Sequence, residues 1–217
     1  MTTHPQPLAV LWDMDGTLID QTVAIVRCYE AVIAELGHPA PDRQAIRRSL
    51  GGPMASTMAL FVEDSQLEDA CQQFRARFPE MMYDGMVILP GALACMKYFA
   101  GLKIPQAILT NKHGETARAV SKHCGFDTFV RVCLGNGDTE WSKPEPELGR
   151  TVLERLGIEA AGVIMIGDSP TDVATALAID IPCYAVATGA HSAAELQVAG
   201  AHASYPCLNT LLADLQA

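Results

Sequence analysis

The chain has 217 residues and a formal net charge of −10; 49% of its residues are hydrophobic and 18% are charged. This composition predicts a packed globular protein, either one good-sized domain or a core domain with a smaller insertion, and argues against disorder. The acidic balance argues against a general surface for nucleic acid or an anionic membrane. No apolar run reaches the roughly 18 residues of a membrane-spanning helix, so we expect neither nucleic acid nor a membrane as a partner.

The seven cysteines are an odd number without a C-x-x-C pair, which indicates reduced and mostly buried thiols. The first residues, MTTHPQPLAVLW, lack the basic segment and long apolar run of a secretory signal. We therefore expect a cytoplasmic protein.

The first predicted strand is the apolar run LAVLW at residues 8–12, which indicates a strand buried on both faces. Asp13, Asp15 and Gly16 follow it, at the end of the strand where open α/β sheets bind ligands. Two carboxylates this close repel each other, so we expect a compensating cation, and hard oxygen ligands favour Mg²⁺. The alternative at this point is an ordinary Asp-Gly turn with two strand-end acids.

Residues 20–86 are predicted to be entirely helical. Apolar residues spaced three and four apart indicate four helices, at 21–36, 42–50, 54–62 and 66–82. We expect no strand in this stretch, which forms an insertion directly after the first strand.

Strands alternate with helices from residue 89 onward. The strands are expected at 106–109, 130–134, 163–166, 181–187 and, as an edge strand, 201–204. The intervening helices are expected to end near 101, 124, 156 and 179, and one more closes the chain. This alternation predicts an α/β fold with a doubly wound parallel sheet.

Polar residues follow two later strands, as they follow the first. Thr110 and Asn111 can donate hydrogen bonds to a phosphate, although both are also common helix N-caps. Lys143 lies in SKPEPE, where the prolines restrict the backbone. Such a lysine could be held over two or more acids and a phosphoryl group; the alternative is a solvated surface lysine.

The segment GDSPTD at residues 167–172 follows a strongly apolar strand. Ser169 suits a helix N-cap and Asp172 the third helical position, so capping alone explains both. Capping does not explain Asp168, an acid that ends a buried strand. Asp168 and Asp172 can face the same point.

The order and spacing of these groups resemble the haloacid dehalogenase superfamily of phosphotransferases. DMDGT at 13–17 is similar to its first motif, Thr110-Asn111 to its second, Lys143 to its third and GDSPTD to its fourth. The resemblance implies a core domain at 1–19 and 87–217, with the first strand near the centre. Residues 20–86 stand where one subgroup carries a small helical cap domain.

The resemblance also implies a role for each residue. Asp13 would attack phosphorus to form an aspartyl phosphate, and Asp15 would act as general acid and base. Mg²⁺ would be held by Asp13, the backbone carbonyl of Asp15, and Asp168, with Asp172 bound directly or through another ligand. The remaining phosphoryl oxygens would be met by Gly16, Thr110, Asn111 and Lys143.

Within the superfamily, Asp15 favours phosphotransferases, because the dehalogenases lack this acid. Residues 20–88 contain no lysine, which argues against phosphonoacetaldehyde hydrolases and their Schiff-base lysine. The phrases PGALACMKYF and LTNKHGETARAVSKHCGF resemble phosphoglycolate phosphatases. We therefore expect an Mg²⁺-dependent phosphatase, as a monomer or homodimer, acting on a small phosphorylated metabolite.

The main alternative is a sugar phosphomutase of the β-phosphoglucomutase kind, followed by a pyrophosphatase, a nucleotidase or a non-catalytic phosphate-binding regulator. In the cap, Arg47, Arg48 and the Gly51-Gly52 turn are candidates for substrate contact, and we expect one arginine of the pair to serve; the alternative is solvated helix arginines. Asp180 stands where the family usually has a glycine.

Overall fold

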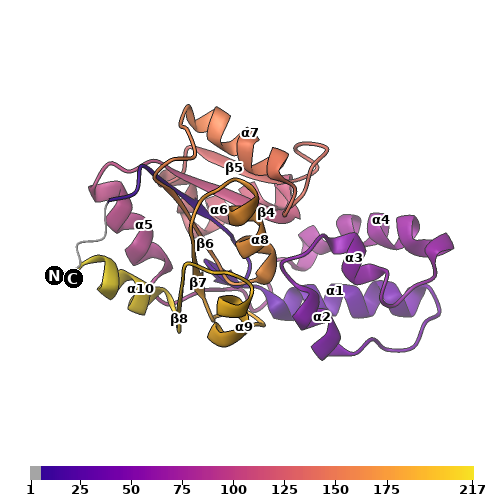
Figure 1. The fold of residues 1–217 in the computed structure, drawn as a ribbon. Helices are drawn as coiled ribbons and strands as arrows, with labels where there is room; N and C mark the ends of the chain where they lie inside the picture. Colours follow the sequence, from indigo (N-terminus) through magenta and orange to yellow (C-terminus); the bar gives the residue numbers. More distant parts are fainter. Residues whose placement is uncertain (1–5) are drawn as a thin grey trace.

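The strand β1 (Ala9–Trp12) lies in the interior of a parallel sheet in a computed structural model that describes residues 6–217 (Figure 1). It pairs with β4 (Gln106–His113) on one side and β6 (Val163–Gly167) on the other. Over the described residues the sheet has six strands in the order β5-β4-β1-β6-β7-β8, all paired in parallel. The outer strands are β5 (Val132–Asn136), β7 (Cys183–Val186) and β8 (Ala203–Tyr205). The predicted parallel α/β sheet is confirmed.

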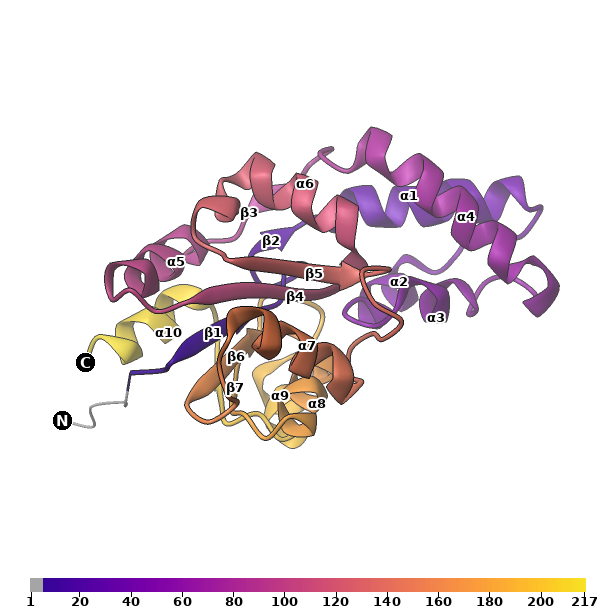
Figure 2. The same ribbon diagram turned by 90° about the horizontal axis from the view of Figure 1, so that it is seen from above.

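Helices cover both faces of the sheet because the side chains of β1 alternate in direction and are all apolar (Figure 2). Val10 and Trp12 pack in the cluster that includes α5 (Ala92–Gly101), α6 (Gly114–Cys124) and α10 (Leu208–Leu215). Ala9 and Leu11 pack in the opposite cluster. Its helices are α7 (Pro146–Leu156), α8 (Pro170–Ala178) and α9 (Ala193–Val198). The sequence did not predict α9.

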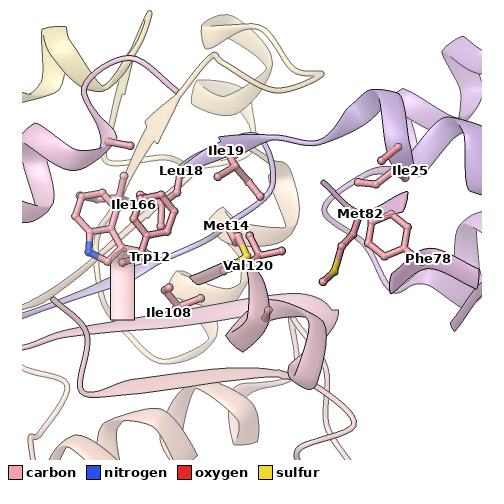
Figure 3. Packing of buried hydrophobic residues seen from close by; sticks show 14 of the residues in the cluster. Trp12, Met14, Leu18, Ile19, Ile25, Phe78, Met82, Ile108, Val120 and Ile166 are labelled. Atoms are coloured by element: carbon pink, nitrogen blue, oxygen red, sulfur yellow. The ribbon is translucent and has the colours of Figure 1, made fainter. Parts of the chain in front are cut away.

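Trp12 anchors the first of these clusters (Figure 3). Its ring meets that of Phe99 edge-on at a centroid distance of 5.9 Å, and its indole N–H donates to Gln106 Oε1 at 3.0 Å. The single polar atom of this large side chain is therefore satisfied inside the core.

Four further helices lie together beyond one end of the sheet (Figure 1). They are α1 (Thr22–Glu35), α2 (Arg43–Ser49), α3 (Met54–Met58) and α4 (Asp64–Met81). All four predicted helices are formed, although α3 is shorter than expected. Aromatic rings join α1 to α4, with Tyr29 4.6 Å from Phe74 between centroids. These helices are called the cap below, and the division of the chain into a core and a cap domain stays a prediction; its residues 1–5 lie outside the described part.

A short antiparallel ribbon connects the cap to the sheet. Its strands are β2 (Ile19–Asp20) and β3 (Val87–Ile88), and Ile19 pairs with Ile88. The expectation that residue 20 lies outside any strand is wrong, because two residues are too few to show an alternating pattern. The ribbon brings the two ends of the cap segment side by side.

Other boundaries shift in ways that polarity explains. β4 continues to His113 although the apolar run ends at Leu109, so polar residues that suggested a strand end belong to the strand. Asp180 has φ 57°, in the left-handed region that favours glycine, which explains why a glycine is usual there.

Within residues 6–217, no helix has the length and hydropathy needed to span a membrane.

Candidate active site

Three buried carboxylates meet at the C-terminal ends of neighbouring strands. Asp13 follows β1, Asp168 follows β6, and Asp172 lies in the first turn of α8. One ligand oxygen from each lies within 4.8 Å of the others. Parallel strands end at the same edge of a sheet, so residues that are far apart in the sequence lie together there as one acidic cluster.

Lys143 lies against this cluster and is fully buried. Its Nζ is 2.6 Å from Asp13 Oδ1 and 2.6 Å from Asp172 Oδ1. The alternative of a solvated lysine is therefore wrong. Burial by itself lowers the pKa of Lys143, but the two carboxylates outweigh burial and raise it, so the side chain is charged.

The carboxylates are not fully neutralised by this one ammonium group. Burial, opposed by Lys143 and reinforced by Asp172, raises the pKa of Asp13 to about 6. Burial and the neighbouring Asp13 and Asp172 raise the pKa of Asp168 well above its ordinary value. Two carboxylates with raised pKa values, beside a third that is also buried, fit a divalent cation, which would favour the ionised forms of Asp13 and Asp168.

The hydrogen bonds distinguish the three acids. Asp172 Oδ2 accepts from the backbone N–H groups of Asp168 and Ser169 and from Ser169 Oγ, while its Oδ1 contacts Lys143. Ser169 is the N-cap of α8 and Asp172 its third residue, as predicted, and the two side chains also form a capping box. Among residues 6–217, no side-chain hydrogen bond reaches Asp13 Oδ2 or Asp168 Oδ2. These two oxygens are the ones free to bind a cation.

Glycines surround the Asp168 carboxylate. A Cβ on Gly16 would lie 2.3 Å from Asp168 Oδ2, and one on Gly189 would lie 1.7 Å from the same atom. Thr17 Oγ1 donates to Asp168 Oδ1 at 2.8 Å, and Thr188 Oγ1 donates to the Gly16 carbonyl at 2.6 Å. Thr188 and Gly189 were missed by the sequence reasoning, although their position just after the predicted strand 181–187 is a signal that could have identified them.

Thr110 and Asn111 lie at the same edge, and both are buried. Asn111 Nδ2 donates to the carbonyls of Gly51 and Lys143 at 2.9 and 3.1 Å, and its Oδ1 accepts from the Lys143 N–H at 2.8 Å. The Asn111 side chain therefore holds the Lys143 loop and the cap turn, and both amide hydrogens are already used. The N-cap of α6 is His113, so the alternative of helix capping by Thr110 or Asn111 is wrong.

Lys112 is a site residue that the sequence reasoning missed. Its Nζ contacts Asp15 Oδ2 at 2.9 Å, donates to Gln21 Oε1, and lies 5.0 Å from the centroid of the Phe78 ring. Asp15 is thus not part of the acidic cluster. Lys112 links it instead to Gln21, the N-cap residue of α1. The signal was its place directly after Asn111.

The two candidate arginines of the cap have different surroundings. Arg48 Nη2 lies 2.6 Å from Glu195 Oε1, an exposed ion pair that connects α2 to α9. Arg47 lines a cavity of about 310 Å³ beside Asp15 and Asp168. Gly51 lies against the core, because a Cβ there would be 2.7 Å from Ser169 Oγ.

A second cavity of about 350 Å³ separates the cap from the ends of the strands. Asp13, Asp15 and Thr110 form part of its core side, and residues of α1 and α4 form much of its cap side. A cavity of this size is in the range of roughly 300–1,000 Å³ that small-molecule sites occupy.

A family model described as haloacid dehalogenase-like hydrolase matches residues 10–186. The chain belongs to this family. The resemblance and the fold inferred from the four motifs are therefore confirmed.

Curated relatives of this hydrolase carry phosphatase names. It is 30% identical over 196 residues to a probable phosphatase IndB of Dickeya dadantii, covering 88% of this chain and 85% of that protein. It is also 30% identical over 194 residues to a phosphoglycolate phosphatase of Rhodospirillum rubrum, covering 84% of this chain and 80% of that one.

Solved structures share the fold of the hydrolase. A putative haloacid dehalogenase-like hydrolase from Bacteroides fragilis superimposes with a TM-score of 0.88 at 23% identity, covering 94% of this chain and 99% of that one. A putative phosphoglycolate phosphatase from Lactobacillus delbrueckii superimposes with a TM-score of 0.88 at 20% identity, covering 97% of this chain and 99% of that one.

Most of the predicted site residues of this hydrolase meet at one edge of the sheet. These are Asp13, Asp15, Gly16, Thr110, Asn111, Lys143, Asp168 and Asp172. Arg47 reaches the neighbouring cavity, whereas Arg48 is turned to Glu195. The roles assigned to these residues stay predictions.

Proposed function

We propose that this hydrolase is an Mg²⁺-dependent phosphatase that acts on a small phosphorylated metabolite through an aspartyl-phosphate intermediate. The observation that carries the proposal is Asp13, whose carboxylate lies beside the buried ammonium of Lys143 and opens onto a cavity of ligand size. The names of the curated relatives support the same reaction class.

Asp13 would act as the nucleophile with Oδ1, the oxygen that contacts Lys143, which leaves Oδ2 for the metal. Lys143 would bind the phosphoryl oxygens as a fixed positive charge, with the Thr110 hydroxyl lining the same cavity. Asp15 would protonate the leaving alcohol and then deprotonate the water that hydrolyses the aspartyl phosphate. Asn111 and Asp172 would act by positioning Lys143, since both contact it directly.

The oxygens that would hold the metal are Asp13 Oδ2 and Asp168 Oδ2, joined by the backbone carbonyl of Asp15. A cation bound there supplies positive charge to the carboxylates and to the phosphoryl group. Oxygen ligands favour Mg²⁺ over softer metals. In this proposal Asp172 is not a direct ligand, because its oxygens already accept four hydrogen bonds.

The place of action proposed is the cytoplasm. Over residues 6–217 all seven cysteines are free thiols, and burial raises the pKa of several of them, Cys28, Cys95 and Cys133 among these. Such inert thiols suit a reducing compartment. That the protein is a monomer or a homodimer stays a prediction.

The test is phosphate release from p-nitrophenyl phosphate with and without Mg²⁺. We expect Mg²⁺-dependent turnover that Asp13→Asn lowers by at least about 10³, because the amide cannot attack phosphorus. Asp127→Asn, a change at an exposed carboxylate that does not line the cavity, should keep wild-type turnover. Circular dichroism should show both variants folded. A folded, Mg²⁺-loaded protein without activity on any phosphate ester would refute the phosphatase.

A further inference from the structure

The cap side of the 350 Å³ cavity is an apolar wall. It is built by two helices, α1 and α4, and the residue after α4. The side chains are those of Ile25, Tyr29, Phe74, Phe78 and Met82. Figure 3 shows Ile25, Phe78 and Met82 turned toward one another on these elements. In the text below these five residues are called the apolar wall.

The polar atoms of this wall are already satisfied. The Tyr29 hydroxyl donates to the Met54 carbonyl at 3.2 Å, so the ring and not the hydroxyl is offered to a ligand. The Tyr29 and Phe74 rings lie 4.6 Å apart, and the Phe74 and Phe78 rings stack at 5.3 Å. The wall therefore presents contiguous aromatic surface that favours an apolar, planar ligand.

The charges around the cavity disfavour an anionic leaving group. Its basic residues are Lys112, Arg75 and His113. Lys112 is already paired with Asp15 and Gln21, and Arg75, which also lines the cavity, is exposed to solvent. His113 lines the core side beside Glu115, another acid of the cavity. A carboxylate pressed against the apolar wall would lose its hydration, and the five residues of the wall offer it no cation.

The distribution of charge also separates two parts of the site. Asp13 and Thr110 line the core side of the cavity, and the buried Lys143 contacts Asp13, so the phosphoryl group would bind on this side. The apolar wall faces them across the cavity, where the leaving group would lie. The cavity is larger than a leaving group as short as glycolate requires.

We propose that the leaving group of the substrate is an alcohol carrying a neutral, apolar ring, seated on the apolar wall. This rests on the phosphatase function proposed above and names its substrate class. A short anionic alcohol such as glycolate is a poor fit, and a sugar would find few hydrogen-bonding side chains on the wall.

Three phosphate esters of primary alcohols test the proposal: benzyl phosphate, ethyl phosphate and phosphoglycolate. The reacting groups are alike, so differences in kcat/KM report the remainder of the leaving group. We expect kcat/KM for benzyl phosphate to exceed the other two by about tenfold or more. Phosphoglycolate equal to or better than benzyl phosphate would overturn the proposal.

Failure of the phosphatase function itself has a different signature, namely no turnover of any of the three esters. The ring preference is then decided by binding of non-hydrolysable analogues, measured by calorimetry with Mg²⁺ present. Benzylphosphonate binding about tenfold tighter than phosphonoacetate supports the apolar wall as a ring site. Equal binding, or tighter binding of phosphonoacetate, overturns it.

Phe74→Ala tests the wall directly. Phe74 is chosen over Phe78 because Lys112 lies over the Phe78 ring, and its loss would also disturb Asp15. We expect the benzyl-to-ethyl ratio of kcat/KM to fall about tenfold, with partial recovery in Phe74→Leu. This ratio is insensitive to an unfolded fraction, which lowers both rates equally. Leu60→Ala, a matched truncation at an exposed cap position, should keep the ratio. An unchanged ratio in Phe74→Ala would contradict the proposal.

Discussion

The Asp168 carboxylate depends on neighbours that have no side chain. Gly16 and Gly189 approach it so closely that any Cβ would occupy the space of its oxygens. Gly16 also has φ 85°, a conformation that side-chain-bearing residues rarely adopt. The loop after β1 and the loop after β7 can therefore close on the acid only while both positions remain glycine.

Gly16→Ala tests this close approach, with Gly37→Ala as a matched control. Gly37 has a similar φ of 82° but nothing within 4 Å of a built Cβ, so it isolates the cost of the backbone conformation, about 1–2 kcal/mol. Gly16→Ala adds displacement of Asp168. We expect a larger loss of unfolding free energy in urea and a fall of at least about tenfold in kcat. Equal effects of the two substitutions would contradict the clash.

The raised pKa values of Asp13 and Asp168 predict a pH-dependent response to metal. The pKa of Asp13 is about 6 in the folded protein against 3.8 ordinarily, so the metal-free protein loses stability as pH rises through this interval. A divalent cation favours the ionised carboxylates. The rise in Tm on adding Mg²⁺ should therefore be larger at about pH 7.5 than at about pH 5.

The control for this response is Asp168→Asn, measured by the same thermal unfolding. Its rise in Tm with Mg²⁺ should be smaller than that of the wild type at about pH 7.5. A response to Mg²⁺ that is equal at both pH values would place the binding site elsewhere.

At the scale of elements, β4 determines how the cap meets the core. Because the strand continues to His113, Asn111 and Lys112 lie on it as neighbours with different directions. Asn111 reaches Lys143 and the cap carbonyl of Gly51, while Lys112 reaches Asp15 and Gln21. The end of β4 thus contacts two predicted catalytic residues, Lys143 and Asp15. It also contacts the cap segment at two places, Gln21 and Gly51.

Lys112→Met tests whether this strand end positions Asp15. Loss of the ammonium leaves Asp15 without its ion pair, so kcat should fall by about tenfold or more, part of the 10²–10⁴ that general acid–base catalysis contributes. Lys97→Met, on the exposed side of α5, should leave kcat unchanged. A shift in the pH profile of kcat in Lys112→Met alone would separate positioning of Asp15 from a general loss of stability. Wild-type kcat and pH profile would contradict this role.

The whole molecule is held together at a narrow connection. The cap enters and leaves through β2 and β3, which pair as neighbouring antiparallel strands, with Asp20 opposite Val87. Beyond this ribbon, the contacts of the cap with the core include an exposed ion pair from Arg48 and the hydrogen bond from Asn111. Exposed ion pairs contribute little, about 0–1 kcal/mol, which suits a cap that must admit substrate.

Replacing residues 21–86 by Asn-Gly tests the predicted division into core and cap. The dipeptide closes a two-residue hairpin between Asp20 and Val87, whose strands already pair. We expect a cooperatively unfolding core that keeps its Tm response to Mg²⁺, since the acidic cluster belongs to the sheet. Loss of cooperative unfolding would contradict an independent core domain, as would loss of the Mg²⁺ response in a folded core.

The sequence by itself determined most of the order of strands and helices, although not the short α9, because apolar periodicity and the residues that end each element are local properties. It also determined which polar residues follow the apolar strand runs, and parallel topology brings those ends together, so Asp13, Thr110 and Asp168 could be predicted as neighbours. It failed at β2 and β3, whose stability comes from pairing with each other and not from any pattern of their own.

Only the tertiary structure decided which side chains become partners within that edge. Lys112 and Asp15 are 97 residues apart in the sequence. The separation is 147 residues for the pair Arg48 and Glu195, and 172 residues for the pair Thr188 and Gly16. Such contacts depend on the directions of side chains and on the approach of backbones, which the chain sets only after it has folded. The same holds for the apolar wall, whose residues look like ordinary helix core until the cap is placed opposite Asp13.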